Sequence, residues 1–183
     1  MKLTIPVSDS DQTKGKGNAP VTLVEYGDFE CPYCRLAYPI VEEIQKIKGD
    51  GIRIVFRNFP LSQIHPHALH AAYAAEATAK QGKFWEMYYL LLENQEALED
   101  QDLLTYAKRL NLDIQQFKKD MGSEEVAKKV KDDFMGGVRS GVNGTPTFFI
   151  NGIRFDGSYE PGSLQKAIES TLKHRRKGGA TNE

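Results

Sequence analysis

Both cysteines of this 183-residue chain lie in one tetrapeptide, Cys31-Pro32-Tyr33-Cys34. Two thiols at this spacing, at the start of a helix, can form and break a disulfide with little movement of the backbone. Unpaired N–H groups and the helix dipole favour an anion at a helix N-terminus, which predicts a lowered pKa for the Cys31 thiol. Cys31 is therefore the predicted attacking thiolate and the more exposed thiol. Cys34, one turn further in, is the predicted resolving thiol.

Two other uses of the pair stay open. A structural disulfide would close a loop of four residues, for which the chain-entropy model extrapolates to roughly 2 kcal/mol. Zinc would need four ligands, and His65, His67 and His70 could supply the remainder. However, His65-Pro66-His67 is typical of a helix entry, where an exposed histidine is unremarkable. Redox chemistry is the favoured interpretation.

The elements that must position this pair follow from hydrophobic periodicity and turn residues. Apolar, β-branched runs predict strands over 21–26 and 52–56, with a helix over 32–48 between them. Asn151-Gly152 between two apolar runs predicts a hairpin of strands 147–150 and 153–156. Helical patterns cover most of 66–140 and also 161–173. Within the block we expect helices over 100–110, 113–120 and 124–138, with Asp113 and Ser123 as N-caps.

The order β-α-β, helical block, hairpin and α predicts an α/β, thioredoxin-like fold with an inserted α-helical subdomain. We expect a flexible N-terminal arm over 1–19, one domain over 20–173 with the insertion at about 62–140, and a disordered basic tail over 174–183.

Charge and hydropathy exclude several function classes. The chain has 24 basic and 25 acidic residues, so no overall field attracts nucleic acid. No apolar run approaches the roughly 20 residues that cross a bilayer. The first 20 residues lack the apolar region of a secretory signal. We therefore expect a cytoplasmic protein if the chain is complete, and a periplasmic or extracytoplasmic one if it is a trimmed mature form.

Three segments carry a resemblance to a known family. The first, residues 25–34, is a strand end, a short aromatic loop and the redox motif (EYGDFECPYC). The second is FRNFPL at 56–61, followed by His65-Pro66-His67 and an alanine-rich helix. The third is VNGTPTFFING at 142–152. Together they resemble the DsbA-like thiol:disulfide oxidoreductases of the thioredoxin superfamily, particularly the bacterial group with an extended helical insertion.

The resemblance implies roles for individual residues. An acid six residues before the first cysteine lies beneath the disulfide in this family, which makes Glu25 a candidate general base for Cys34. The resemblance also implies a cis Thr145-Pro146 bond that faces the thiols, with Thr145 tuning potential and substrate release. Pro32 and Tyr33 shape the site between the cysteines. Pro-Tyr departs from the Pro-His common in the family, so we expect an intermediate reduction potential.

We accordingly expect a dithiol–disulfide oxidoreductase, of the oxidase type, that acts as a monomer on protein thiols through Cys31 and Cys34. The pair itself would be the redox centre, so no bound cofactor and no metal are expected. A membrane oxidase or a thiol reductant would recycle it. The alternatives are a polypeptide-binding holdase with the pair idle or regulatory, and a glutathione-dependent DsbA-like enzyme.

Overall fold

A central mixed β-sheet organises the part of the chain that the computed structural model describes, residues 1–157 and 162–178, the last five by backbone only. Within these residues the sheet has five strands in the order β1-β3-β2-β4-β5. Their bounds are β1 Gln12–Lys14, β2 Val21–Gly27, β3 Ile52–Asn58, β4 Thr147–Ile150 and β5 Ile153–Arg154. β2 runs parallel to β3 and antiparallel to β4, so β2 lies at the centre and is paired on both edges.

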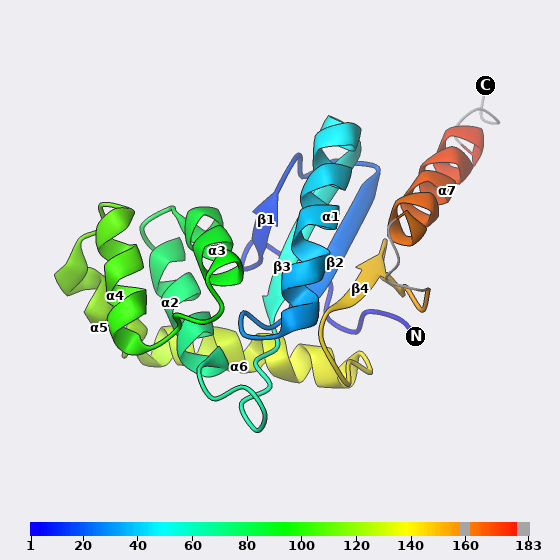
Figure 1. Cartoon of the computed structure of the whole chain (residues 1–183). Coiled ribbons are helices and arrows are strands. Elements are labelled where there is room, and N and C mark those ends of the chain that lie inside the picture. The colour runs from blue at the N-terminus through cyan, green and yellow to red at the C-terminus, as the bar shows by residue number, and fades with distance from the viewer. Residues whose placement is uncertain (158–161, 179–183) are drawn as a thin grey trace.

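The two faces of the sheet follow the alternation of side chains along each strand. Val21 and Leu23 of β2 pack on the face that also buries Val41 of α1 and Ile168 of α7. Helix α1 spans Pro32–Lys48 and helix α7 spans Ser163–Gly178, and Figure 1 shows both beside the sheet. Glu25 has the same parity as Val21 and Leu23, so its side chain points to the α1 face.

The opposite face is covered by the N-terminal arm and by helix α6, Glu124–Arg139. Val24 and Tyr26 of β2 contact apolar residues of the arm and of α6 there, including Val7 and Phe134. In Figure 1, α6 passes below the sheet and connects the helical insertion to β4. The central strand is therefore buried on both faces, which explains its almost continuous apolar sequence.

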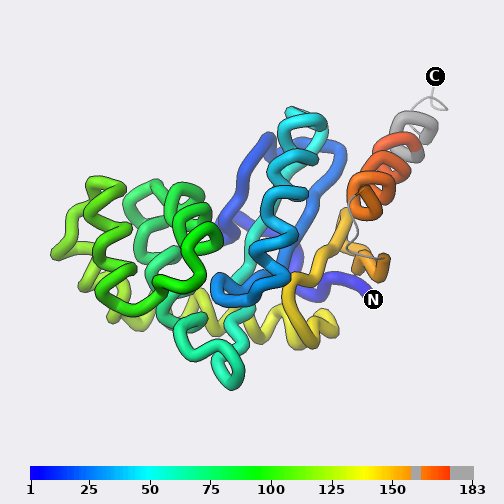
Figure 2. Tube along the Cα trace, viewed as in Figure 1, coloured from blue at the N-terminus to red at the C-terminus, as the bar shows by residue number. Residues whose placement is uncertain are grey.

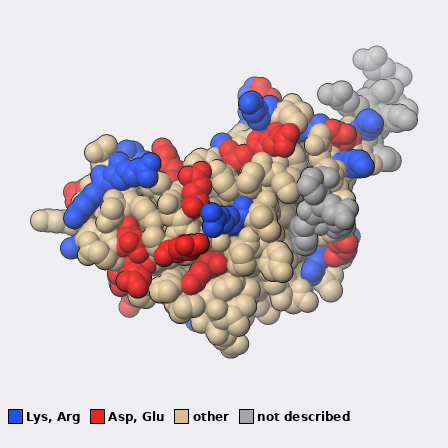
Figure 3. All heavy atoms as spheres, in the orientation of Figure 1, with Lys and Arg blue, Asp and Glu red and all other residues tan. Residues whose placement is uncertain are grey.

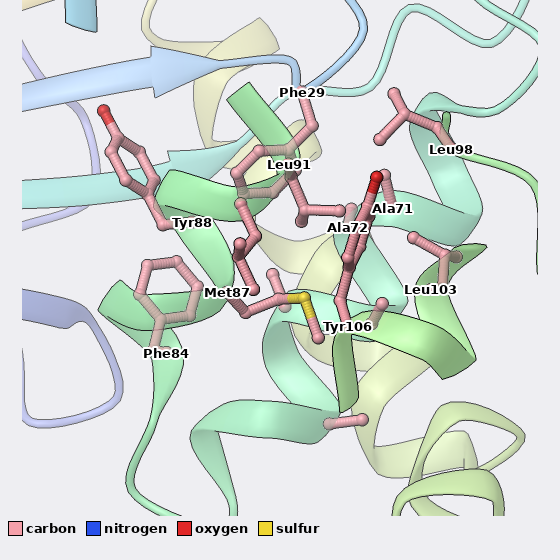
Figure 4. Packing of buried hydrophobic residues seen from close by; sticks show 14 of the residues in the cluster. Phe29, Ala71, Ala72, Phe84, Met87, Tyr88, Leu91, Leu98, Leu103 and Tyr106 are labelled. Atoms are coloured by element: carbon pink, nitrogen blue, oxygen red, sulfur yellow. The ribbon is translucent and has the colours of Figure 1, made fainter. Parts of the chain in front are cut away.

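The helical insertion contains α2 Ala68–Ala79, α3 Phe84–Glu93, α4 Asp100–Arg109, α5 Ile114–Met121 and α6. In the tube view of Figure 2 helices α2 to α5 form a lobe to one side of the sheet, and α6 extends from this lobe below the sheet. The alanine-rich α2 packs against the other four, because short side chains permit close approach on several sides. Phe29, just before the cysteines, lies among buried side chains of this lobe, such as Leu91 (Figure 4). The redox loop and the insertion thus share one hydrophobic core.

Most predicted boundaries in the insertion and the hairpin are confirmed. The side chain of Asp113 accepts a hydrogen bond from the Gln116 backbone N–H, and Ser123 accepts one from Val126, as N-caps do. Asn151 and Gly152 both have positive φ, 47° and 80°, as a tight hairpin turn requires. The second hairpin strand ends at Arg154 rather than at residue 156.

Two predictions about the ends of the chain need correction. The arm over 1–19 was expected to be flexible, but it contains β1, which pairs with β3. The Arg57 guanidinium also binds Asp11 and the backbone carbonyls of Ile5 and Pro6, which fastens the arm to the sheet. At the other end, α7 continues to Gly178, into the predicted tail. Residues 158–161, where this helix was expected to begin, and 179–183 lie outside the described residues.

Candidate active site

Cys31 and Cys34 stand at the N-terminus of α1 as free thiols. Cys31 is the N-cap residue, with φ −73° and ψ 121°, and no side chain forms a capping hydrogen bond there. Pro32 occupies the first helical position, where its missing N–H costs nothing. Both cysteines belong to the core cluster, with 3% of Cys31 and 1% of Cys34 exposed. The predicted order of exposure is present, but Cys31 is far more buried than an exposed thiol.

The pKa of the Cys31 thiol is lowered to about 5. The largest cause is a hydrogen bond from the Cys34 thiol, and burial opposes it. The contact with Thr145 and the backbone N–H groups of Cys34 and Tyr33 lower the pKa further. The Cys31 sulfur thus lies at the start of α1, where unpaired backbone N–H groups favour its anion. At neutral pH Cys31 is an anion.

The pKa values of Cys34 and Glu25 are raised rather than lowered, because burial disfavours the charged form of both groups. Burial raises the pKa of Cys34 well above its usual value, and the neighbouring Cys31 and Glu25 raise it further. Burial likewise raises the pKa of Glu25 to about 8, which an interaction with the Tyr88 hydroxyl offsets only in part. Neither carboxyl oxygen of Glu25 has a close hydrogen-bond partner among the described residues. One buried carboxyl group that is protonated at neutral pH thus lies near the two sulfurs.

The Thr145–Pro146 segment faces the cysteines from the start of β4. The peptide bond is cis, and the Cys31 Sγ lies 3.4 Å from the Thr145 carbonyl oxygen. The Thr145 hydroxyl is buried and lacks a close hydrogen-bond partner. On the other side, Pro32 and Tyr33 are exposed, with 68% of Tyr33 accessible. The Cys31 sulfur therefore lies between the exposed side chain of Tyr33 and the start of β4.

The three histidines that were considered for zinc each bind a different carboxylate. The Nδ1 atoms of His65, His67 and His70 lie 2.8, 2.9 and 2.7 Å from Asp28, Glu30 and Asp100, respectively. Over residues 1–157 and 162–178, no group of three or more histidine, cysteine or acidic side chains is arranged to hold a metal ion.

Sequence reasoning assigned no role to Asp28, which organises the redox loop. Its buried carboxylate accepts from the Leu61 and Glu30 backbone N–H groups and contacts His65. Its own backbone N–H points to the Cys34 Sγ at 3.4 Å. An aspartate in a short loop between a strand and a redox motif was the available signal, because aspartate commonly satisfies backbone N–H groups in turns.

Gln95 was also missed. It lies between α3 and α4, and its side-chain amide donates to the carbonyl oxygens of Phe29 and Cys31. Nothing local in the sequence marks it, since its partners are more than 60 residues away.

The surface beside the thiols is acidic. Glu93, Glu96, Glu99 and Asp100 are exposed on and after α3, in the segment whose Gln95 touches the redox loop. Figure 3 shows acidic side chains gathered on this side of the molecule. Neighbouring carboxylates disfavour the ionised form of a thiol and so raise its pKa. Hydrogen bonds, rather than nearby cations, thus keep the pKa of Cys31 low.

A separate pocket of about 940 Å³ lies between the arm, α2 and α6, and its lining includes neither cysteine. Its buried charges already bind one another: Arg57 pairs with Asp11, and Lys129 with Asp133. We therefore place the candidate site at the thiols.

Comparison with known proteins identifies the family of the fold. A family model described as thioredoxin matches residues 8–170. A thioredoxin-like oxidoreductase from Silicibacter pomeroyi is 27% identical, with a TM-score of 0.80 over 93% of this chain and 94% of that one. Oxidised BdbD from Bacillus subtilis is also 27% identical, with a TM-score of 0.79 over 92% and 96%. Wolbachia pipientis alpha-DsbA1, 22% identical with a TM-score of 0.82 over 96% and 97%, shares the fold.

The curated relatives that the chain matches are named as antiporters rather than as oxidoreductases. The chain is 47% identical, over 95% of its length, to 27% of a protein named Na(+)/H(+) antiporter NhaA 1 from Salinispora arenicola. It is 44% identical, over 93% of its length, to 28% of a protein of the same name from Mycolicibacterium vanbaalenii. The chain thus spans little more than a quarter of these relatives. In the described part of the chain, no helix has the length and apolar character needed to cross a membrane.

Proposed function

The chain belongs to the thioredoxin family and is DsbA-like within that superfamily, and from this premise we propose that it exchanges disulfides with protein thiols through Cys31 and Cys34. The observation that carries the proposal is the difference between the pKa values of the two thiols. The pKa of Cys31 is about 5, whereas that of Cys34 is raised well above its usual value. Such a pair combines one stable thiolate with one thiol that holds its proton.

The proposed reaction, in the oxidising direction, starts from the Cys31–Cys34 disulfide. A substrate thiolate attacks the Cys31 sulfur, a mixed disulfide forms, and Cys34 leaves as a thiolate that takes up a proton. A second substrate thiolate then attacks the substrate sulfur of the mixed disulfide. Cys31 leaves as a thiolate, and the substrate disulfide is complete. Two electrons pass from the substrate to the pair, and in the reverse direction Cys31 attacks and Cys34 resolves.

The oxidase direction is favoured by the low pKa of Cys31. A thiolate that is stabilised in the reduced protein makes the couple more oxidising, and it also leaves the mixed disulfide faster. The value of about 5 lies between the thiol of thioredoxin, roughly 7, and that of DsbA, roughly 3.5. We therefore propose a reduction potential between about −270 and about −120 mV.

Glu25 is proposed as the proton donor and acceptor for Cys34. A carboxyl group with a pKa of about 8 exists in both protonation states near neutral pH, which suits general acid–base catalysis. Its burial on the α1 face excludes bulk water from the transfer. Pro32, Tyr33, Thr145 and Pro146 are proposed to shape the substrate-binding surface, with substrate backbone lying beside Thr145.

Because the pair carries both electrons, the proposed reaction uses no bound cofactor. It does need a partner that reoxidises the pair, such as a membrane oxidase, or a thiol reductant if the flow is reversed. An oxidase of this type would work in an oxidising compartment outside the cytoplasm. We do not propose antiport, because the antiporter name belongs to proteins of which the matched segment is 27–28%.

The test compares the wild type with Cys31→Ser. Wild-type protein equilibrated in glutathione buffers should give a potential inside the stated range, and it should catalyse disulfide exchange with insulin or a reduced, unfolded protein. The Cys31→Ser variant should lose at least about 100-fold of the exchange rate, because it lacks the nucleophile.

A holdase with an idle pair would instead suppress aggregation equally well with or without Cys31 and would show no exchange in either form. Equal exchange rates for the two proteins, or a potential at either extreme of the range, would contradict the proposal. Exchange that requires glutathione as the obligatory substrate would favour the glutathione-dependent alternative.

A further inference from the structure

The redox loop contacts His65 and His67 at the start of the helical insertion, and the side-chain amide of Gln95 reaches it from between α3 and α4. We propose that Gln95 is a positioning residue that holds the Cys31 backbone in the conformation that stabilises its thiolate. This inference rests on the proposed function. It assigns the helical insertion a role in the chemistry of Cys31, in addition to its packing against the redox loop.

The amide of Gln95 uses both of its hydrogens on this loop. Its Nε2 donates to the Phe29 carbonyl oxygen at 2.8 Å and to the Cys31 carbonyl oxygen at 2.9 Å. The two carbonyls are two residues apart, so a single planar group fixes the orientation of two peptide units. A side chain without hydrogen-bond donors at position 95 would remove both of these hydrogen bonds.

The segment that carries Gln95 is itself held firmly. The Asn94 side chain donates to the Leu90 carbonyl and closes the end of α3. The Tyr106 hydroxyl donates to the Ala97 carbonyl, and Leu98 is buried in the core. Because its neighbours are fixed on the side of the insertion, Gln95 presents its amide from a rigid support.

The orientation of the Cys31 backbone matters because it sets where the sulfur lies relative to the first backbone N–H groups of α1. The backbone N–H groups of Tyr33 and Cys34 lower the pKa of Cys31, and they can do so only while Cys31 keeps its extended N-cap conformation. The Cys31 N–H is held by the Asp28 carbonyl at 3.2 Å. On the carbonyl side of the same residue, the oxygen accepts from the Cys34 and Arg35 backbone N–H groups, and Gln95 adds a side-chain donor.

Other tethers bind the loop in a different direction. Asp28 accepts from the Leu61 backbone N–H, and Glu30 accepts from that of His67, so both fasten the loop to the segment that precedes α2. They act on residues 28 and 30 through their own carboxylates. The Gln95 contact acts on the Cys31 peptide itself, which is the unit that sets the position of the sulfur.

Loss of the Gln95 amide should therefore raise the pKa of Cys31 and make the couple less oxidising. The expected rise in the pKa of Cys31 is about 0.5 to 1, which is a threefold to tenfold change in the thiol–thiolate equilibrium. The same change should shift the equilibrium constant with glutathione by about threefold to tenfold toward a more reducing couple.

The experiment uses Gln95→Met in the full-length chain, since methionine keeps the length of the side chain and removes both donors. The matched control is Gln81→Met. Gln81 is also a partly buried glutamine of the insertion, and its amide joins the Asp113 backbone rather than the redox loop. For each protein we would measure the pKa of Cys31 from thiolate absorbance and alkylation rate, the glutathione equilibrium, and urea denaturation.

The expected result is a raised Cys31 pKa and a less oxidising couple in Gln95→Met, with both unchanged in Gln81→Met. A loss of stability in Gln95→Met without a change in either redox quantity would overturn the proposal, because it would show a purely structural contact. Equal pKa shifts in both variants would overturn it as well. Failure of the proposed function is distinguishable, since the wild type itself would then show no disulfide equilibrium with glutathione.

Discussion

At the scale of single residues, the site works by unequal burial of ionisable groups. Glu25 is 1% exposed and has no close hydrogen-bond partner for its carboxyl oxygens in the described structure. Isolated burial of this kind destabilises the charged form of a carboxyl group. The fold thus holds a destabilising group where it is proposed to serve catalysis, which is a common compromise at active sites.

This burial predicts a specific dependence of stability on pH. Between the ordinary pKa near 4.5 and the folded-state pKa of about 8, Glu25 is ionised when unfolded and protonated when folded. The folded state then binds more protons, so this group lowers the free energy of unfolding as pH rises through the window, by on the order of 3 kcal/mol at pH 7. Glu25→Gln should abolish that decrease, which denaturation by urea at several pH values would reveal.

The measurement is cleanest in a Cys31→Ser background, where the thiolate cannot titrate. The difference in unfolding free energy between Glu25→Gln and its parent should grow in favour of the variant from pH 5 to pH 8. Parallel curves for the two proteins over this interval would show that the carboxyl group is not buried in the way described.

At the scale of elements, α6 approaches the sheet closely at two successive glycines. A Cβ on Gly137 would lie 2.7 Å from the Phe59 ring and 3.0 Å from the Tyr26 ring. A Cβ on Gly136 would meet Ile5 at 3.3 Å and the Tyr26 hydroxyl at 3.5 Å, which is less severe. The absence of a side chain at position 137 therefore sets the distance between α6 and the aromatic residues of the sheet face.

We predict opposite effects for alanine at these two neighbouring positions. Alanine favours a helix over glycine by about 1 kcal/mol, whereas overpacking costs about 1 to 3 kcal/mol. Gly137→Ala should therefore lower the free energy of unfolding by up to about 2 kcal/mol, while Gly136→Ala should leave it unchanged or raise it. Urea denaturation of both variants would decide, and equal stability of the two would refute the close approach at 137.

At the scale of the whole molecule, the N-terminal arm is an integral part of the domain. Arg57 of β3 is almost fully buried, and its guanidinium forms a bidentate pair with Asp11 at 2.7 and 3.0 Å. It also donates to the Tyr26 hydroxyl on the central strand. One cation thereby connects the arm, the sheet and the face that α6 covers.

Removal of the charge on Asp11 should consequently be costly. Asp11→Asn leaves the Arg57 charge buried without its counter-ion, and breaking a buried pair costs about 3 to 5 kcal/mol. Because the guanidinium keeps its carbonyl partners, we expect a loss near the lower figure, as measured by denaturant unfolding. The exposed pair of Lys16 and Asp50 provides the control, since Asp50→Asn should change stability by less than about 1 kcal/mol. Similar losses for the two variants would contradict the role assigned to the arm.

Local patterns in the sequence were sufficient for the elements and for the chemistry of the thiols. Periodicity and turn residues located α1, β2, β3, the hairpin and the caps at Asp113 and Ser123, because each depends on neighbours within a few positions. The order of the elements predicted the fold class and three motifs predicted the DsbA-like family, and both are confirmed. β1 was missed because three residues of modest hydrophobicity, Gln12–Lys14, form a strand only through pairing with β3.

Tertiary structure decided what surrounds the sulfurs. Gln95 touches the Cys31 carbonyl from 64 residues away, and the sequence between them has no feature that predicts the contact. The burial of Cys31 depends likewise on the insertion packing against the redox loop. The spacing of Cys31 and Cys34 thus determined which atoms can react. Only the folded chain determined how strongly each sulfur holds its proton, because burial and long-range hydrogen bonds exist only once distant segments meet.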